Sequence, residues 1–308
     1  MRSWIHRCAV RTTVVACVVA AFVAHARADE TTAPSVAATA DQVGAGLQYP
    51  LGVAAARDGT LVVADRLLPG LWQVTAGRID PLAVGSKRFR TPLNAVRAVA
   101  VAPDGTVYAG DSATREVYRI PTEGEPQPLT AGAIGIPVDI AIDSSGRLFV
   151  SDLETQRVWR IDPGKSEPVE VTTLAAPRGL FVDGKDRLWV VAASGEAPLV
   201  RVAADGTVEP VVTTRAFSFP HDVVVDDAGV AYVSDNYAHC IWRVSADGMP
   251  EKWVEGLPLV GPVGLAMRDG NVLVADPRAR QVFEIDPSKN VVPVITAGDG
   301  GPPGGRAP

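Results

Sequence analysis

The stretch Phe219–Val244, FPHDVVVDDAGVAYVSDNYAHCIWRV, is the clearest copy of a unit that occurs six times along this chain. It contains a proline opening, an apolar run, a D-x-G-type turn, a second apolar run that ends in Ser-Asp, and a tryptophan within Ile-Trp-Arg-Val. Two apolar runs separated by a short polar turn are typical of a β-hairpin. The repetition of this unit decides the fold.

Three columns of residues keep their spacing over the six copies. The second apolar run ends at positions 65, 111, 152, 192, 235 and 276, which gives steps of 46, 41, 40, 43 and 41 residues. A proline or valine precedes this position by fifteen residues in five copies and by fourteen in the sixth. An aromatic residue follows it by seven residues in every copy except the fourth. This regular spacing predicts a repeat architecture.

Each copy is expected to form four short strands. In the third copy these are residues 138–142, 148–151, 157–161 and 170–173. One four-stranded sheet cannot bury both of its faces alone, whereas sheets stacked radially bury them against their neighbours. We therefore predict an all-β fold over residues 46–297, a six-bladed β-propeller of four-stranded antiparallel blades. The first copy holds its own first strand and the last copy its own fourth, so the repeats should be in phase with the blades.

The N-terminal region has the pattern of a secretory signal peptide. A basic start precedes a mostly apolar run over 12–24, and small residues precede a cleavage site after Ala28. The run is shorter than the roughly 20 residues of a membrane span. We expect a signal peptide over 1–28, a flexible lead-in over 29–45, a disordered Gly/Pro-rich tail over 298–308, and a periplasmic or extracellular protein. Lipid anchoring at Cys17 stays open.

Removal of residues 1–28 changes the charge and the cysteine count. These residues hold four Arg and no Asp or Glu, so the 29 basic and 35 acidic residues of the whole chain leave a net charge of −10. An acidic protein repels phosphate backbones, which argues against a nucleic-acid partner. Cys240 is then the single cysteine, so no intrachain disulfide can form and the stability must come from a core. No later segment is apolar enough to span a membrane, and we expect a monomer.

The columns resemble those of the NHL-repeat propellers. The matching patterns are P-x-G-[apolar]-x-[apolar], D-G-x-[apolar]-[apolar]-V-[AS]-D and R-V-[WY]-R-I, and they cover about 250 of the 308 residues. At superfamily level the chain is similar to gluconolactonase/regucalcin-like enzymes and to streptogramin (virginiamycin B) lyases, with peptidylglycine amidating lyases as cousins. The resemblance implies a six-bladed propeller, but it says little about chemistry because one fold hosts many functions.

The residue after each proline begins the innermost strand, so it is expected to rim a central pocket. The resemblance implies metal ligands around this column in a lactonase and histidines in a lyase, and the chain departs from both. The first column offers one ligand, His221, and strand alternation opposes an inward position for the neighbouring Asp139 and Asp222. Two histidines remain after cleavage, so a three-His zinc site cannot form. We expect no cofactor, with a divalent metal as the disfavoured alternative. The first column is Leu51, Arg97, Val138, Arg178, His221 and Val263, and the second is Gly52, Ala98, Asp139, Gly179, Asp222 and Gly264.

Arg97, Arg178 and His221 around one axis would attract a carboxylate, phosphate or sulfate. The alternative is that each arginine pairs with Asp139 or Asp222. We predict a module that binds a protein or a small anionic ligand through these five residues. A lyase or lactone hydrolase with His221 as base or ligand is the second hypothesis. The count of possible metal ligands favours the binding module.

Three further features have structural interpretations. The Asp that ends the second strand in five copies is expected to accept backbone N–H bonds from the following turn. The aromatic column should pack between neighbouring sheets, and Cys240 should be buried. The insertion at 85–94, which is rich in basic residues, should share a face with Arg97, where it covers the pocket, meets an acidic partner or is merely solvated. Phe217 and Phe219 are expected at the rim beside His221.

Overall fold

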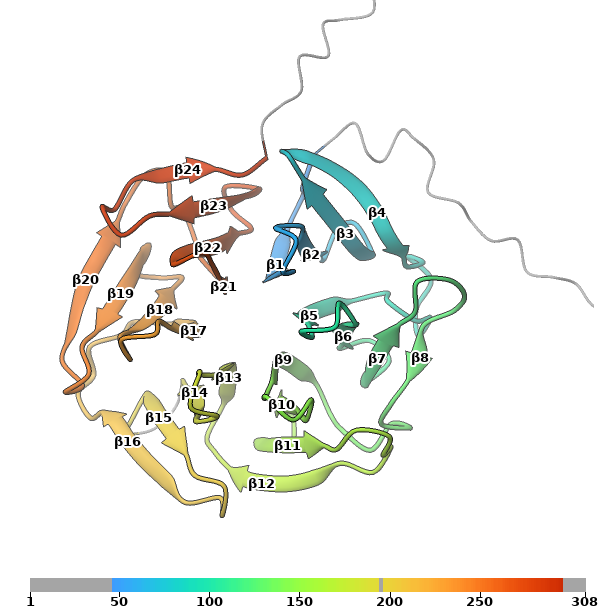
Figure 1. Ribbon diagram of the computed structural model, residues 1–308, viewed down its shortest axis with the longest axis horizontal. Helices are drawn as coiled ribbons and strands as arrows, with labels where there is room; N and C mark the ends of the chain where they lie inside the picture. The colour runs from blue at the N-terminus through green and yellow to red at the C-terminus, as the bar shows by residue number, and fades with distance from the viewer. Residues whose placement is uncertain (1–45, 194–195, 296–308) are drawn as a thin grey trace, which may run out of the picture. The chain divides into compact units, whose positions relative to one another are not determined.

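The computed structural model describes residues 46–193 and 196–295, and within them all regular structure is β (Figure 1). Six antiparallel sheets of four strands each follow one another along the chain. Each sheet comes from one sequence repeat, so the predicted six-bladed propeller and its phase are confirmed. The predicted signal peptide, the lead-in and the tail lie outside the described residues.

The innermost strand of each blade faces the centre and the fourth lies at the outside (Figure 1). Blade 1 contains β1 (Pro50–Ala55), β2 (Leu61–Asp65), β3 (Gly70–Thr75) and β4 (Arg78–Val84). Blade 2 contains β5 (Val96–Val101), β6 (Val107–Asp111), β7 (Glu116–Ile120) and β8 (Gln127–Pro128). Blade 3 contains β9 (Pro137–Ile142), β10 (Leu148–Asp152), β11 (Arg157–Ile161) and β12 (Val169–Thr173).

The second half of the propeller repeats this order. Blade 4 contains β13 (Pro177–Val182), β14 (Leu188–Ala192), β15 (Leu199–Val202) and β16 (Val208–Val212). Blade 5 contains β17 (Pro220–Val225), β18 (Ala231–Asp235), β19 (Cys240–Val244) and β20 (Pro250–Glu255). Blade 6 contains β21 (Gly264–Arg268), β22 (Asn271–Asp276), β23 (Gln281–Ile285) and β24 (Val291–Pro293). In blade 3 the predicted strand ends agree with these bounds to within one residue.

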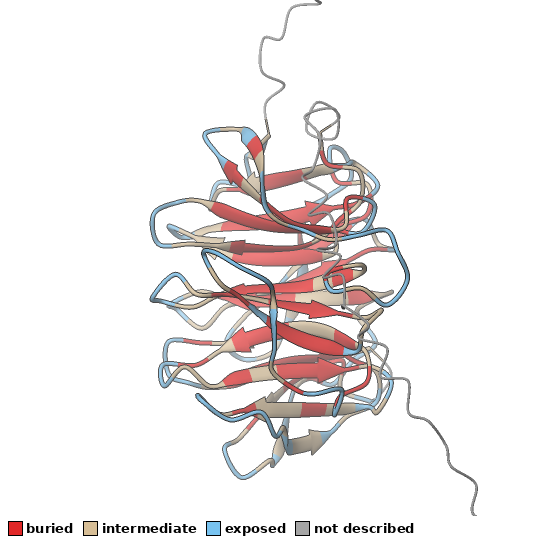
Figure 2. Cartoon of the chain, turned by 90° about the vertical axis from the view of Figure 1, so that its right-hand side faces the viewer, coloured by how far each residue is buried: buried red, intermediate tan, exposed pale blue. Residues whose placement is uncertain are grey.

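The hydrophobic core lies between neighbouring sheets, where the buried residues concentrate in the middle of the strands (Figure 2). Trp72 of blade 1 packs with Leu273 and Val282 of blade 6, and Tyr118 of blade 2 packs with Leu71 of blade 1. The aromatic column therefore packs between blades as predicted. Cys240 is also buried, and burial raises the pKa of its thiol to about 12.

The aspartates that end the second strands hold the loops around them, and this role confirms the hydrogen bonding expected of them. Asp65, for example, is fully buried and accepts N–H bonds from Leu67 and Leu68 of the following turn. It also accepts bonds of 2.7 and 2.8 Å from Gln48 and Tyr49. The carboxylate thus ties the turn after its strand to the segment that enters the same blade.

Antiparallel pairing places the loops on two opposite faces. Pro50 at the start of β1 pairs with Asp65 at the end of β2, and Gly70 at the start of β3 pairs with Val84 at the end of β4. The β2–β3 turns and the connections between blades therefore share one face, which we call the entry face. The β1–β2 and β3–β4 turns form the opposite turn face. The described part of the chain contains no helix of the length and apolarity that a membrane crossing requires.

Candidate functional site

The start of the innermost strand carries a β-bulge in five of the six blades. The register shifts between Pro50 and Gly52, between Val96 and Ala98, and at the matching points of blades 3, 4 and 5. A bulge places two residues opposite one and so interrupts the alternation of side chains between the two faces. Strand alternation was the argument against an inward Asp139 or Asp222, and it does not apply at this point.

A cavity of about 350 Å³ lies on the axis, lined by residues from the innermost strands of all six blades. Both columns contribute, because His221 and Asp222 line it together, as do Val138 and Asp139. Arg97 also lines the cavity. Most of the remaining wall is aliphatic, so the few polar groups in it stand out. Four of the five predicted site residues therefore meet in one cavity.

Asp139 and Asp222 come from blades 3 and 5, and their carboxyl groups approach each other beside Gly179 of blade 4, close enough to form a hydrogen bond when one of them is protonated. Asp139 Oδ2 accepts the N–H of Leu180 at 2.7 Å, whereas a Cβ at Gly179 would overlap the side chain of Asp222. Both carboxyls thus converge on the same backbone segment. Burial raises the pKa of Asp139 to about 6, and burial together with the charge of Asp139 raises the pKa of Asp222 well above its usual range. Both shifts favour a state in which the two carboxyls share one proton over a state in which both are ionised.

A serine in the second strand supports each member of this pair. Ser151 Oγ accepts the N–H of Asp139 at 3.0 Å and donates to the carbonyl of Arg178 in the next blade. Ser234 has the same role for Asp222 and donates to Val263. The other four copies have Ala, Gly or Val at the position of this serine, and none of them has Asp in the second column. The serine is therefore the sequence feature that would have identified the aspartate pair.

Arg97 and Arg178 have no carboxylate partner among the described residues, since neither makes an ion pair and neither guanidinium makes a hydrogen bond there. Both side chains are half-buried. Burial lowers the pKa of Arg97 and of Arg178, and a neighbouring cation, Arg66 or Arg97 respectively, lowers it further. Guanidinium groups remain charged despite such shifts. The predicted alternative, in which each arginine pairs with an aspartate, is therefore absent.

His221 directly precedes Asp222 in the chain and lines the same cavity as Arg97. Burial, followed by the charges of Arg178 and Arg97, lowers the pKa of His221 to about 3. The imidazole is thus neutral at physiological pH, where it can accept or donate a hydrogen bond but adds no charge. The positive potential at the mouth of the cavity comes from the two arginines.

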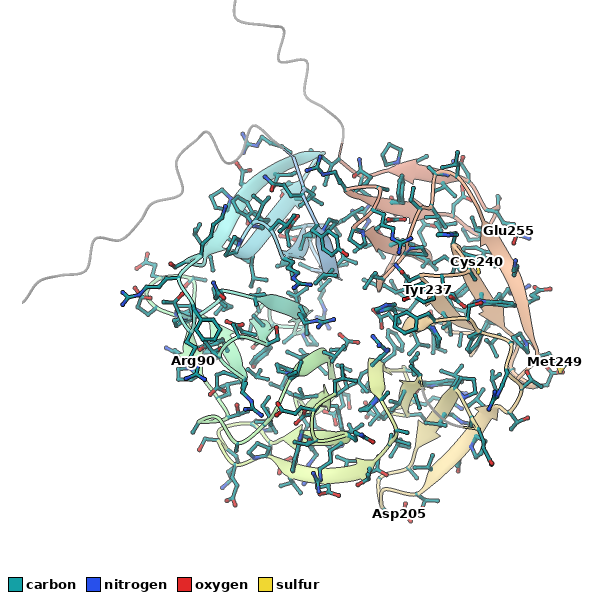
Figure 3. All side chains as sticks on the ribbon, turned by 180° about the vertical axis from the view of Figure 1, so that it is seen from behind. Arg90, Asp205, Tyr237, Cys240, Met249 and Glu255 are labelled. Carbon is teal, nitrogen blue, oxygen red and sulfur yellow. The ribbon has the colours of Figure 1, made fainter. Side chains whose placement is uncertain are left out.

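Aromatic side chains hold the fifth site residue, Arg178, which is not among the residues that line the cavity. Its guanidinium lies 4.5 Å from the ring centroid of Phe219. Phe219 in turn stacks on Tyr237 with centroids 4.6 Å apart, and its ring meets His221 edge-on. Tyr237 is 61% exposed and lies toward the channel rather than at the outer edge (Figure 3). Tyr237 is not among the predicted site residues, and it offers a planar surface beside the cations.

One expectation about a neighbouring segment needs correction, and the alternatives for another are narrowed. Phe217 does not join the rim, because its ring packs edge-on against Trp242 with centroids 5.5 Å apart, within the core between blades. The 85–94 insertion does lie on the entry face, but none of its residues lines the cavity. Arg90 of this insertion lies at the outer edge of the propeller (Figure 3).

The residues present do not suit a lactonase-type metal. Within residues 46–193 and 196–295, no three His, Cys, Asp or Glu side chains are grouped so that they could hold an ion. Asp139 and Asp222 each accept two backbone N–H bonds and share a proton, so they do not provide two free anionic ligands. A hard divalent cation requires more oxygen ligands than this pair supplies.

Comparison with known proteins agrees with this architecture. The NHL repeat family matches residues 217–244. This stretch is similar to an NHL repeat. This match lies in the fifth copy, and the NHL pattern thus contains Phe219, His221, Asp222 and Tyr237 of the site. No curated protein matches the chain.

Solved structures share the fold of this NHL-type propeller at low sequence identity. Virginiamycin B lyase from Staphylococcus aureus is 15% identical, with a TM-score of 0.62, over 80% of this chain and 84% of the lyase. A gluconolactonase from Xanthomonas campestris is 17% identical, with a TM-score of 0.64, over 75% and 84%. A chain of a nidogen/laminin complex is 17% identical, with a TM-score of 0.63, over 74% and 89%. At such identities the likeness shows the fold alone.

Proposed function

We propose that this propeller is a binding module that takes a small anionic ligand, or an anionic group of a protein partner, into its central cavity. The observation that supports the proposal is the pair of half-buried guanidiniums without a carboxylate partner at the cavity mouth. Two half-buried like charges near each other raise the free energy of the empty site, and an anion bound between them would relieve this repulsion. A planar carboxylate matches the fork geometry of arginine.

The aspartate pair would complete the site at greater depth. A carboxyl that keeps its proton near neutral pH can donate a hydrogen bond to an oxygen of the ligand, whereas an ionised carboxylate would repel an anion. His221 adds a neutral donor or acceptor between the two ends. The site therefore favours a ligand with an anionic group at the arginines and a neutral oxygen at the aspartates.

Calorimetric titration with succinate, phosphate and sulfate tests this proposal. The double variant R97A/R178A is expected to weaken binding of the preferred anion by about tenfold or more, because desolvated charge pairs contribute strongly to affinity. The variant R97K/R178K should restore part of the affinity, since lysine keeps the charge without the fork. R57A/K185A, which removes two exposed cations from the turn face, is the matched control. Equal affinity in R97A/R178A and the wild type would refute the site.

A lyase or lactone hydrolase is the second candidate, and the aspartate pair favours it. Two carboxyls that share a proton can act as acid and base, and the neutral His221 lies in the same cavity. Turnover of a streptogramin B or of a lactone by the purified protein, abolished in D139N and D222N but retained in D205N, would establish catalysis. Elemental analysis of the purified protein adds a separate test, because a stoichiometric divalent metal would favour the enzyme.

We also propose export of the chain by cleavage after Ala28, which rests on the N-terminal sequence pattern alone. Expression of the full chain in a bacterial host, fractionation and N-terminal sequencing test it. A mature protein in the periplasm or medium that begins at Asp29 is the expected result. Retention of residues 1–28 in the cytoplasm would overturn the proposal.

A further inference from the structure

The loops of the entry face carry a group of exposed cations that spans blades 6, 1 and 2. The β22–β23 turn of blade 6, the β2–β3 turn of blade 1 and the β4–β5 connection between blades 1 and 2 contribute them. All six side chains are exposed, and none makes an ion pair with a described residue. We call this group the cationic crescent: Arg66, Lys87, Arg88, Arg90, Arg278 and Arg280.

The opposite face has the opposite charge, for a reason built into the repeat. The turns there need Asp to accept the N–H two residues ahead, as Asp58, Asp104 and Asp205 do at 2.9 Å with Thr60, Thr106 and Thr207. Among the described residues, the exposed aspartates are therefore concentrated on the turn face. The net charge of −6 for the whole chain conceals a cationic surface on the entry face.

We propose that the cationic crescent is a docking surface for an acidic polypeptide segment. Charge complementarity supplies the first argument, since six unpaired cations on adjacent loops attract a run of carboxylates. Apolar contacts supply the second. Phe89 is 74% exposed beside Arg90, and Leu67 is 48% exposed beside Arg66. Aromatic and arginine side chains together are typical of protein interfaces.

Continuity with the cavity favours a polypeptide over a membrane surface. Arg66 of the crescent is close enough to Arg97 to lower its pKa, and Arg97 lines the cavity. The cations thus run from the outer edge of blade 1 to the axis. A flexible acidic segment can follow this path and place one carboxylate between Arg97 and Arg178, whereas a flat lipid surface cannot enter the cavity. The placement of a carboxylate between Arg97 and Arg178 rests on the proposed function, whereas the docking surface at the crescent does not.

Fluorescence anisotropy with a labelled polyglutamate peptide tests the crescent. At about 0.1 M salt, where charges act over about 10 Å, the triple variant K87E/R88E/R90E is expected to weaken binding by about tenfold or more. The matched control R57E/K185E/K289E makes the same change of charge on exposed, unpaired residues of the turn face and should bind as the wild type does. Thermal melts of both variants confirm that these surface changes leave the fold intact.

The remaining outcomes overturn one proposal at a time. Equal weakening in both triple variants, or in neither, contradicts a docking surface at the crescent. Binding to phosphatidylglycerol vesicles that depends on the crescent, without binding of the peptide, assigns the surface to a membrane and refutes the polypeptide. If R97A/R178A binds succinate, phosphate and sulfate as the wild type does, but crescent-dependent peptide binding persists, the cavity proposal fails while the crescent stands.

Discussion

Asp139 and Asp222 occupy positions that Gly or Ala holds in the other four blades. Inner strands approach closely there, since a Cβ at Gly52 would overlap the carbonyl of Arg97. The two aspartates fit because the strand bulges there and the backbone N–H of each one donates to a serine, Ser151 or Ser234. Their carboxyls accept backbone N–H bonds from the next blade, at Leu180 and Leu265. One residue type thus links neighbouring blades and supplies the titratable pair of the cavity.

The shared proton makes stability depend on pH. The folded protein keeps protons on this pair that the unfolded chain releases near its ordinary pKa of 3.8. The resulting stability is fully present below about pH 4 and is lost as the pH rises through 6. In D222N the pair cannot form. The stability advantage of the wild type over D222N is therefore expected to shrink with rising pH, by on the order of 1 kcal/mol per pH unit for one proton.

Urea midpoints of both proteins from pH 4 to 7 measure this difference. The lowered pKa of His221 acts with the opposite sign, but it is present in both proteins and largely cancels. D205N is the control, because hydrogen bonds from Thr207 lower the pKa of Asp205, so that its contribution varies with pH mainly below about pH 4 and the gap between the wild type and D205N should stay nearly constant from pH 4 to 7. A gap between wild type and D222N that stays constant or widens as the pH rises contradicts the shared proton.

At the scale of elements, the aspartate that ends each second strand connects the fold to the site. In blade 5, Asp235 accepts N–H bonds from Ser218 and Phe219 of the entering segment, at 2.7 and 2.9 Å, and from the indole of Trp242 at 3.1 Å. The ring of Phe219 in turn packs against the guanidinium of Arg178. The strand end, the entry loop and the rim therefore form one connected structure.

Asp235→Ala is expected to destabilise the protein by about 3 kcal/mol or more, because several buried N–H groups lose their acceptor at once. It should also weaken anion binding, since the segment that holds Phe219 is released. Asp104→Ala, at an exposed turn with one such bond, should change stability by less than about 1 kcal/mol. Urea denaturation and anion titration of both variants provide the test. If Asp235→Ala has only a mild effect on both measurements, the hydrogen bonds that Asp235 accepts are not needed to hold the entry segment.

At the scale of the whole propeller, the ring closes between blades 6 and 1 by side-chain packing and by two side-chain hydrogen bonds, from Arg268 to the carbonyl of Gly59 and from Arg280 to the carbonyl of Gln48. No strand of the described residues crosses this seam, unlike a blade built from both ends of a chain. Leu47 and Trp72 pack with Ala266, Leu273 and Val282, and a Cβ at Gly264 would overlap the carbonyl of Leu51. Closure thus depends on one large aromatic side chain and on close backbone approach.

Trp72→Ala is expected to cost about 3–5 kcal/mol, as for other buried aromatic truncations, and to loosen the seam first. Hydrogen exchange should accelerate most in β1–β4 and β21–β24. Trp159→Ala is the comparison, because Trp159 packs with Tyr108 of blade 2 and Ile140 of blade 3 and should raise exchange there instead. The same exchange pattern in both variants would show that the ring opens as one unit rather than at its seam.

The local chemistry of the repeat determined much of this protein. Apolar runs, D-x-G turns and the columns of proline, aspartate and aromatic residues are spaced by the blade itself, so they predicted the strands, the phase and the packing role of Trp72. They also placed Arg97, Arg178 and His221 at the start of inner strands, because that position depends on nearby residues only.

Only the tertiary structure decided how these side chains meet. The bulges let residues of both the first and the second column line the cavity, which simple alternation does not predict. They also bring Asp139 close to Asp222 from the other side of blade 4. The lack of partners for Arg97 and Arg178 depends on distances between blades that are far apart in sequence. The cationic crescent likewise joins loops near residues 66, 90 and 280, which the closed ring brings onto one face. A repeat encodes contacts within a unit, whereas charge and proton sharing depend on which different units face one another.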